Sequence, residues 1–149
     1  MKVFMTRHGL TAGNLVHAYS GSGTDEPLCD QGLKKLATLP HHSGVPYVYT
    51  SGMLRTEQTA KELYPGAQTV AVSNLQEMNF GIFEGKNYID LSDNKAYRTW
   101  VDTECREQCP EGESRAQFID RTRKAFLAIL EQEMDKGAEE VHFVVHGGR

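Results

Sequence analysis

The segment Lys2-Val3-Phe4-Met5-Thr6-Arg7-His8-Gly9 passes from apolar and β-branched residues directly into charged residues and a glycine. This change predicts a strand over residues 2–6 that ends in a polar turn. Comparable runs predict further strands at 47–50, 69–72 and 141–145. Helical patterns separate these runs, so we expect a three-layer α/β fold in which a mainly parallel sheet carries helices on both faces.

Caps and apolar periodicity mark the expected helices. Asp30 can cap a helix that ends before Pro40, and Ser114 can cap the longest helix. The apolar face of that last helix carries Phe118, Thr122, Ala125, Phe126, Ile129 and Leu130. Helices are expected at 11–17, 30–39 and 53–64, as one or two short pieces within 88–104, and from about 114 onward, with a loop at 79–85.

Length, charge and cysteine content restrict the class of protein. The 149 residues suit one domain, 1–149, and the net charge of −4 without a run of Lys and Arg argues against nucleic-acid or membrane partners. The apolar N-terminal run is too short for a signal peptide. Three cysteines without a Cys-X-X-Cys pair indicate reduced thiols in a cytoplasmic protein. Cys105 and Cys109 are spaced as half of a helical metal site, but they lack further ligands, so no metal is expected.

Polar side chains follow each of the predicted strands. Arg7 and His8 follow the first, Ser51 the second and His146 the fourth, and Glu77 comes shortly after the third. Ligands of open parallel sheets bind beyond the carboxyl ends of the strands. We therefore expect these side chains to gather at one edge of the sheet.

The residue types at this edge suit the chemistry of a phosphate monoester. The dianionic phosphoryl group needs cations and N–H donors, an in-line nucleophile and an acid for the leaving oxygen. Two arginines, two histidines and one carboxylate meet these needs without a metal. Taken singly, each has an ordinary reading: Arg55 as a surface residue paired with Glu57 or Glu62, His146 as a buried core histidine, and Glu77 or Glu84 as solvated loop carboxylates.

Several motifs occur together, in a fixed order. They are Arg7-His8-Gly9, DEPLCDQG at 25–32, SGMLRTEQTA at 51–60, LQEMNFGIFEG at 75–85, CPEGES at 109–114 and VVHGG at 144–148. In combination the chain resembles the histidine phosphatase (phosphoglycerate mutase-like) superfamily from residue 2 to residue 148. The stretch 75–85 most resembles the α-ribazole phosphatases and the broad-specificity phosphatases of that superfamily.

The resemblance implies a role for individual residues. His8 matches the nucleophile that forms a phosphohistidine, and Glu77 matches the proton donor. The phosphoryl-clamping positions are matched by Arg7, Arg55 and His146, and Asn14 matches a polar position that contacts phosphate. Arg7 and Arg55 are expected to depress the pKa of His8 and keep it neutral for attack.

The expected function is hydrolysis of a small-metabolite phosphate ester, without a cofactor. A phosphoglycerate-type phosphomutase and a non-catalytic phosphate-binding or interaction domain are the alternatives, and a homodimer is left open. The resemblance implies that mutases of the superfamily are longer chains with an insertion after the acid residue. Here only the short segment 88–109 occupies that region, which favours hydrolysis. Two interpretations of the aromatic side chains near the expected site stay open. They line an apolar wall against the leaving group, or they only pack in the interior; the residues are Tyr19, Tyr88, Tyr97 and Trp100.

The resemblance also implies a departure at the C-terminus. Members of the superfamily continue into another helix and a final edge strand, so both elements are expected to be missing after Arg149. The strand 141–145 would then show an uncovered apolar face, with marginal stability or self-association as the consequence.

Overall fold

The computed structural model describes residues 1–147 and contains a four-stranded parallel sheet. The strands are β1 (Lys2–Arg7), β2 (Tyr47–Thr50), β3 (Gln68–Ala71) and β4 (Glu140–Val145). Their order in the sheet is β1-β4-β2-β3, so the last strand in the sequence lies between the first and the second. Gly148 and Arg149, which include the last residue of the VVHGG motif, lie outside the described residues.

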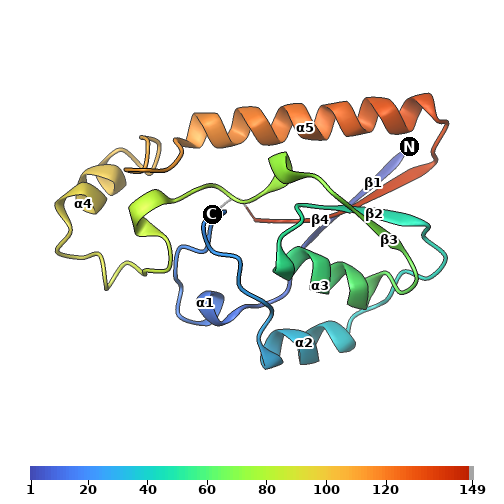
Figure 1. Cartoon of the computed structure of the whole chain (residues 1–149), viewed down its shortest axis with the longest axis horizontal. Coiled ribbons are helices and arrows are strands. Elements are labelled where there is room, and N and C mark those ends of the chain that lie inside the picture. The colour runs from blue at the N-terminus through green and yellow to red at the C-terminus, as the bar shows by residue number, and fades with distance from the viewer. Residues whose placement is uncertain (148–149) are drawn as a thin grey trace.

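Helices connect the parallel strands and cover both faces of the sheet, as Figure 1 shows. The helix α5 (Arg115–Asp135) runs along one face, and α2 (Asp30–Ala37) and α3 (Leu54–Leu63) lie on the other. The shorter elements are α1 (Ala12–Leu15), α4 (Lys95–Asp102) and the 3-10 turns η1 (Ser73–Leu75) and η2 (Gly81–Phe83). The three-layer α/β prediction is confirmed.

Each face of the sheet carries its own core because successive strand residues point to opposite sides. Val48 and Val144 pack toward α2 and α3 with Leu36 and Leu63. Tyr49 and Phe143 face α5 on the other side. Burial of these apolar side chains is the main force that fixes the sheet between its helices.

The third core cluster surrounds α4, at one end of the molecule (Figure 1). Tyr97 and Trp100 are buried there with Phe80, Phe83 and Leu91. The expected packing role is therefore correct for Tyr97 and Trp100. Tyr88, by contrast, is 61% exposed and is not part of this cluster.

The helix cap expected at Ser114, at the start of α5, is confirmed. The Ser114 hydroxyl accepts a hydrogen bond from the Gln117 backbone N–H, and the Gln117 side chain accepts one from the Ser114 N–H. This reciprocal capping box satisfies two N–H groups that the helix itself leaves unpaired.

Three local expectations need correction. The first helix is shorter than 11–17 because His17 has φ of 57°, which ends a right-handed helix. The loop at 79–85 includes the turn η2. Cys105 and Cys109 lie outside any helix, so they do not share a helical face. Within residues 1–147 no group of His, Cys, Asp and Glu is arranged to hold a metal, and no helix has the length and apolarity to cross a bilayer.

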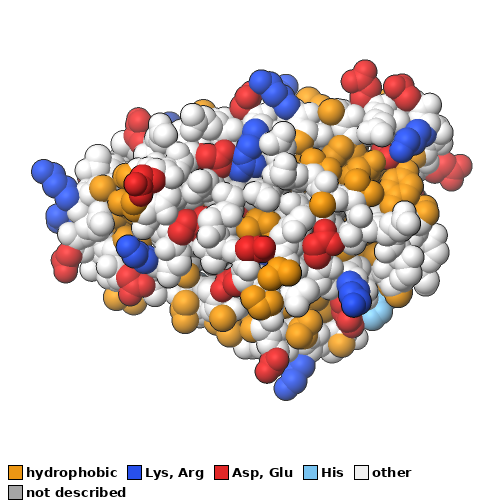
Figure 2. Space-filling model, in the orientation of Figure 1, with side chains coloured by type: hydrophobic (Ala, Val, Ile, Leu, Met, Phe, Trp, Pro, Cys, Tyr) orange, Lys and Arg blue, Asp and Glu red, His pale blue; other side chains and the backbone are white. Residues whose placement is uncertain are grey.

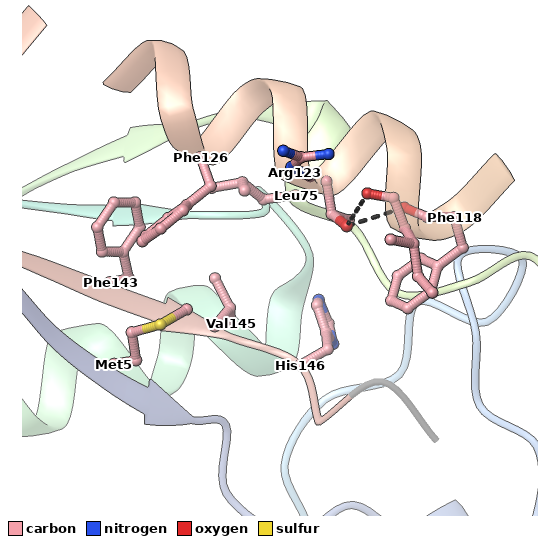
Figure 3. Close-up of a pocket in the computed structure, with 10 residues that line it drawn as sticks. Met5, Leu75, Phe118, Arg123, Phe126, Phe143, Val145 and His146 are labelled. Atoms are coloured by element: carbon pink, nitrogen blue, oxygen red, sulfur yellow. Dashed lines mark hydrogen bonds between the residues drawn. The ribbon is translucent and has the colours of Figure 1, made fainter. Parts of the chain in front are cut away.

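Strand 141–145 shows only part of the apolar face expected for it. Val144 is buried toward α2 and α3, and Val141 and Phe143 are buried against α5, whereas Val145 is half-buried and lines a groove with Phe143. Exposed apolar side chains on the edge strand β1 and on α5 include Val3, Met5, Ile119 and Leu127. Met5 and Phe126 line a groove of about 320 Å³ whose one end is formed by His146 (Figure 3).

Charged side chains are scattered over the surface in Figure 2. Lys and Arg alternate with Asp and Glu on the face shown, without a continuous basic patch. The expectation that the protein has no nucleic-acid partner stays a prediction.

The position of α2 against the sheet yields a test of the core. Leu36 is 4% exposed and packs in the α2–α3 cluster, whereas Leu33, in the same helix, is 40% exposed. Leu36→Ala should lower the free energy of unfolding by about 2–5 kcal/mol because it leaves a cavity. Leu33→Ala should change it by less than about 0.5 kcal/mol. Urea denaturation of both variants measures the difference, and equal effects would contradict this packing.

Candidate active site

His8 lies directly after β1, where its backbone N–H donates to Val145 O at 3.0 Å. Its side chain is buried, and Nδ1 lies 2.6 Å from Gly9 O. A carbonyl oxygen only accepts, so Nδ1 carries the proton and donates it. In the neutral ring this leaves the lone pair on Nε2 as the nucleophilic atom. Thr59 holds the neighbouring backbone by accepting from Gly9 N–H at 2.9 Å.

The environment of His8 keeps this ring neutral. Burial, as the largest cause, and the positive charges of Arg55 and Arg7 together lower its pKa to about 4, against the opposing effects of Gly9 O and Glu26. The expected influence of the two arginines is present, but desolvation is the larger cause. At neutral pH the Nε2 lone pair is therefore available for attack on an electrophile.

Arg55 is the second residue of α3 and is fully buried. Nη1 donates to Thr24 O at 2.6 Å, and Nη2 donates to Ser20 O at 3.0 Å and Gly21 O at 3.2 Å. The surface pairing with Glu57 is not formed, since the Glu57 carboxylate accepts from the Thr50 hydroxyl. Arg55 thus supplies a fixed positive charge inside the site.

His146 follows β4, and its ring centroid lies 5.2 Å from that of His8. Nε2 shares a 2.8 Å hydrogen bond with Ser51 Oγ. Burial, as the largest cause, and the positive charges of Arg55, Arg121 and Arg7 together lower the pKa of His146 to about 2. The strand order brings the two histidines together, because β4 is the direct neighbour of β1.

Glu77 is buried, with 5% of its surface exposed, and its Oε1 accepts from Met78 N–H at 2.9 Å. Among the charges that act on the pKa of buried Arg55, that of Glu77 has the largest effect. Arg121 fixes the Glu77 backbone by donating from Nη2 to its carbonyl at 2.9 Å. The Glu113 carboxylate, in turn, accepts from Arg121 at 2.8 Å.

Arg7 and Asn14 line a cavity of about 250 Å³ together with His8. Arg7 is exposed, and its charge lowers the pKa of both His8 and His146. The Asn14 side-chain oxygen accepts from Thr11 N–H at 3.0 Å, in the capping box of α1. This contact fixes the orientation of the Asn14 amide at the rim of the cavity.

The six residues predicted for the site therefore lie in one region beyond the carboxyl edge of the sheet. Two further contributors carry no signal in the sequence that separates them from surface residues: Arg121, which anchors the Glu77 backbone, and Thr59, which holds Gly9. Ser51, expected at this edge because it follows the second strand, holds His146. Glu84, the other candidate acid, is instead bound to the loop 20–24.

Two buried atoms of this site have no hydrogen-bond partner. Among residues 1–147, Arg55 Nε and His146 Nδ1 are the only buried side-chain nitrogen or oxygen atoms in that condition. Unpaired polar atoms in a protein interior cost about 1–3 kcal/mol each. A site that brings such atoms near the positive charges of Arg55 and Arg7 is suited to an anion with several oxygens.

Comparison with known proteins identifies the family. The model of the histidine phosphatase superfamily (branch 1) matches residues 3–149. The chain belongs to the histidine phosphatase superfamily. The structure is similar to that of the alpha-ribazole phosphatase from Shigella flexneri, with a TM-score of 0.82 and 25% identity over 98% of this chain and 74% of that chain. A phosphoglycerate mutase structure from Bacillus anthracis str. Sterne gives a TM-score of 0.80 and 25% identity over 97% of this chain and 74% of that one.

Curated relatives in the superfamily carry the name probable phosphoglycerate mutase GpmB. The protein from Yersinia enterocolitica is 30% identical over 138 residues, and the protein from Escherichia coli O1:K1 is 29% identical over 132 residues. These matches take in 88% and 84% of this chain. The chain spans 64% and 61% of the length of these two relatives.

The lowered pKa of His8 predicts how the stability of this member of the superfamily depends on pH. An unfolded histidine titrates near 6.5, so between about pH 6.5 and 4 the unfolded state binds a proton that the folded state does not. The free energy of unfolding should therefore fall as the pH is lowered from 6.5 to 4.5. His8→Asn removes this contribution, so its stability should fall less over the same interval. Urea denaturation at both pH values measures the two slopes.

His41→Asn, at an exposed histidine, is the matched control for this experiment. Identical slopes for wild type and His8→Asn would contradict the assignment of a neutral, buried His8.

Proposed function

We propose that the chain is a phosphomonoesterase that hydrolyses a small-metabolite phosphate ester through a phosphohistidine on His8. In the first step the Nε2 lone pair of His8 attacks phosphorus, and the bond between phosphorus and the ester oxygen breaks. A proton from the Glu77 carboxyl group passes to the departing oxygen. In the second step Glu77 takes a proton from water, whose oxygen attacks phosphorus and breaks the P–N bond.

The pair of unpaired buried atoms carries this proposal. Arg55 Nε and His146 Nδ1 lie in the same site as His8, whose Nε2 bears no proton. Phosphoryl oxygens would supply partners for both atoms, while Arg55 and Arg7 would offset the charge of the phosphoryl group. The same contacts would stabilise the oxygens as phosphorus passes from the ester to His8.

Burial of Glu77 supports its role as the acid. The carboxyl group is near Arg55 and is anchored through Met78 N–H and the Arg121 contact to its backbone. An incoming phosphate dianion would raise the pKa of this carboxyl group by repulsion and so favour the protonated form that the first step needs. After the leaving group departs, the same carboxylate serves as the base for water.

A phosphomutase is the second candidate, because the curated relatives are named probable phosphoglycerate mutase. A mutase uses the same phosphohistidine and differs in the acceptor: a hydroxyl group of the substrate attacks phosphorus in place of water. The likeness to an alpha-ribazole phosphatase structure and the short 88–109 segment support hydrolysis.

Hydrolysis of p-nitrophenyl phosphate in excess EDTA is the direct test of the nucleophile. The 149-residue chain should show turnover that EDTA leaves intact. His8→Ala should lower kcat by about a thousandfold or more, since the covalent step is lost, while His41→Ala keeps wild-type turnover. Turnover that survives His8→Ala would overturn the mechanism. A folded chain without turnover would favour a non-catalytic phosphate-binding role.

Product analysis separates hydrolysis from phosphate transfer. With 3-phosphoglycerate as substrate, ³¹P NMR should show inorganic phosphate as the product of any turnover, and no accumulation of 2-phosphoglycerate. Alkaline quenching should preserve a phosphorylated chain, detected as added mass, in wild type and not in His8→Ala. Rapid interconversion of 2- and 3-phosphoglycerate would favour the mutase.

A further inference from the structure

Glu84 lies directly after η2 and binds a loop that is more than 60 residues earlier in the sequence. Its Oε2 accepts from Gly21 N–H at 2.7 Å and from the Thr24 hydroxyl at 2.8 Å. Its Oε1 accepts from Gly23 N–H at 2.9 Å. Both oxygens are thus occupied by donors of the loop 20–24, and hydrogen bonds to a charged acceptor are about twice as strong as neutral ones.

The same loop forms the binding site for the Arg55 guanidinium. The carbonyl groups of Ser20, Gly21 and Thr24 accept the hydrogen bonds that Nη1 and Nη2 of Arg55 donate. Each peptide unit is planar, so an N–H group and the carbonyl group of the preceding residue turn together. When Glu84 holds the Gly21 N–H, it fixes the direction of the Ser20 carbonyl, which accepts from Arg55.

A second connection joins this loop to the segment that bears Glu77. Ser22 N–H donates to Met78 O at 3.1 Å. Gly21 is packed so closely there that a Cβ atom would lie 2.0 Å from Met78 O and 2.4 Å from Glu84 Oε1. The loop therefore lies between Arg55 and the segment 77–84, in contact with both.

We infer that Glu84 is a positioning residue for Arg55. Its carboxylate shapes the loop 20–24, and the loop carbonyls aim the guanidinium so that Nε faces the site of the phosphoryl group. This role rests on the proposed function for its effect on turnover, while the contacts on which it depends are independent of that function. Displacement of a catalytic group by about 1 Å costs on the order of a hundredfold in rate.

Glu84→Gln tests this role with little change in size. The amide nitrogen cannot accept a hydrogen bond, so at least one loop donor loses its partner. We expect kcat/KM for p-nitrophenyl phosphate to fall about ten- to a hundredfold, and the Kd for inorganic phosphate, measured by calorimetry, to rise. The Arg55 Nε–H resonance, assigned with Arg55→Lys, should shift. Glu131→Gln, at an exposed position of α5, is the matched control and should change none of these.

Separate readouts distinguish the possible failures. Loss of folded protein alone would lower the active fraction and leave KM, the phosphate Kd and the Arg55 resonance unchanged, which would overturn the positioning role. Thr24→Val removes one donor to Glu84 and keeps the Thr24 carbonyl, so it should cause a smaller change of the same kind if Glu84→Gln does not fold.

The resonance also separates this inference from the proposed function. A wild-type chain without turnover would refute the phosphatase proposal, yet a shifted Arg55 resonance in Glu84→Gln would still support the positioning role. An active wild type with an unchanged resonance and unchanged kcat/KM in Glu84→Gln would refute the positioning role alone.

Discussion

The buried guanidinium of Arg55 is the interaction on which the rest of the site depends. A charge without water is costly unless it is hydrogen-bonded, and three carbonyl groups of the loop 20–24 accept from Nη1 and Nη2 while Nε stays unpaired. The loop must therefore fold tightly over α3. The charge thus enclosed adds to the lowering of the pKa values of His8 and His146, whose main cause is burial. One residue in this way links loop structure to the protonation state of the site.

The order of the strands provides the second constraint. Placing β4 between β1 and β2 puts the residue after β4 beside the residue after β1, so the rings of His146 and His8 meet. The same arrangement brings Ser51, which follows β2, within hydrogen-bond distance of His146 although the two are 95 residues apart in sequence. Parallel strands also align their carboxyl ends, which concentrates polar groups at one edge of an otherwise apolar sheet.

Particular elements show how far the sequence was a guide. The strands, the helix cap at Ser114 and the position of His8 beyond β1 were predictable, because each follows from neighbours in the chain. The roles of Glu77 and Glu84 were not separable on composition, since both are loop carboxylates in one short motif. Only the fold shows that Glu84 binds the loop 20–24 and that Glu77 is buried near Arg55. Only the fold likewise shows that β1 and α5 expose apolar side chains, while helices on both faces cover most of β4.

By itself the sequence determined which chemical groups follow each strand, and it identified the superfamily to which they belong. Alternation of apolar residues and helix caps act over a few positions, so they can be read without coordinates. Tertiary structure decided which groups lose contact with water, which nitrogen of His8 keeps its lone pair, and which donors of Arg55 and His146 stay unpaired. Those properties depend on residues far apart in the chain, and desolvation acts on a group only through everything packed around it.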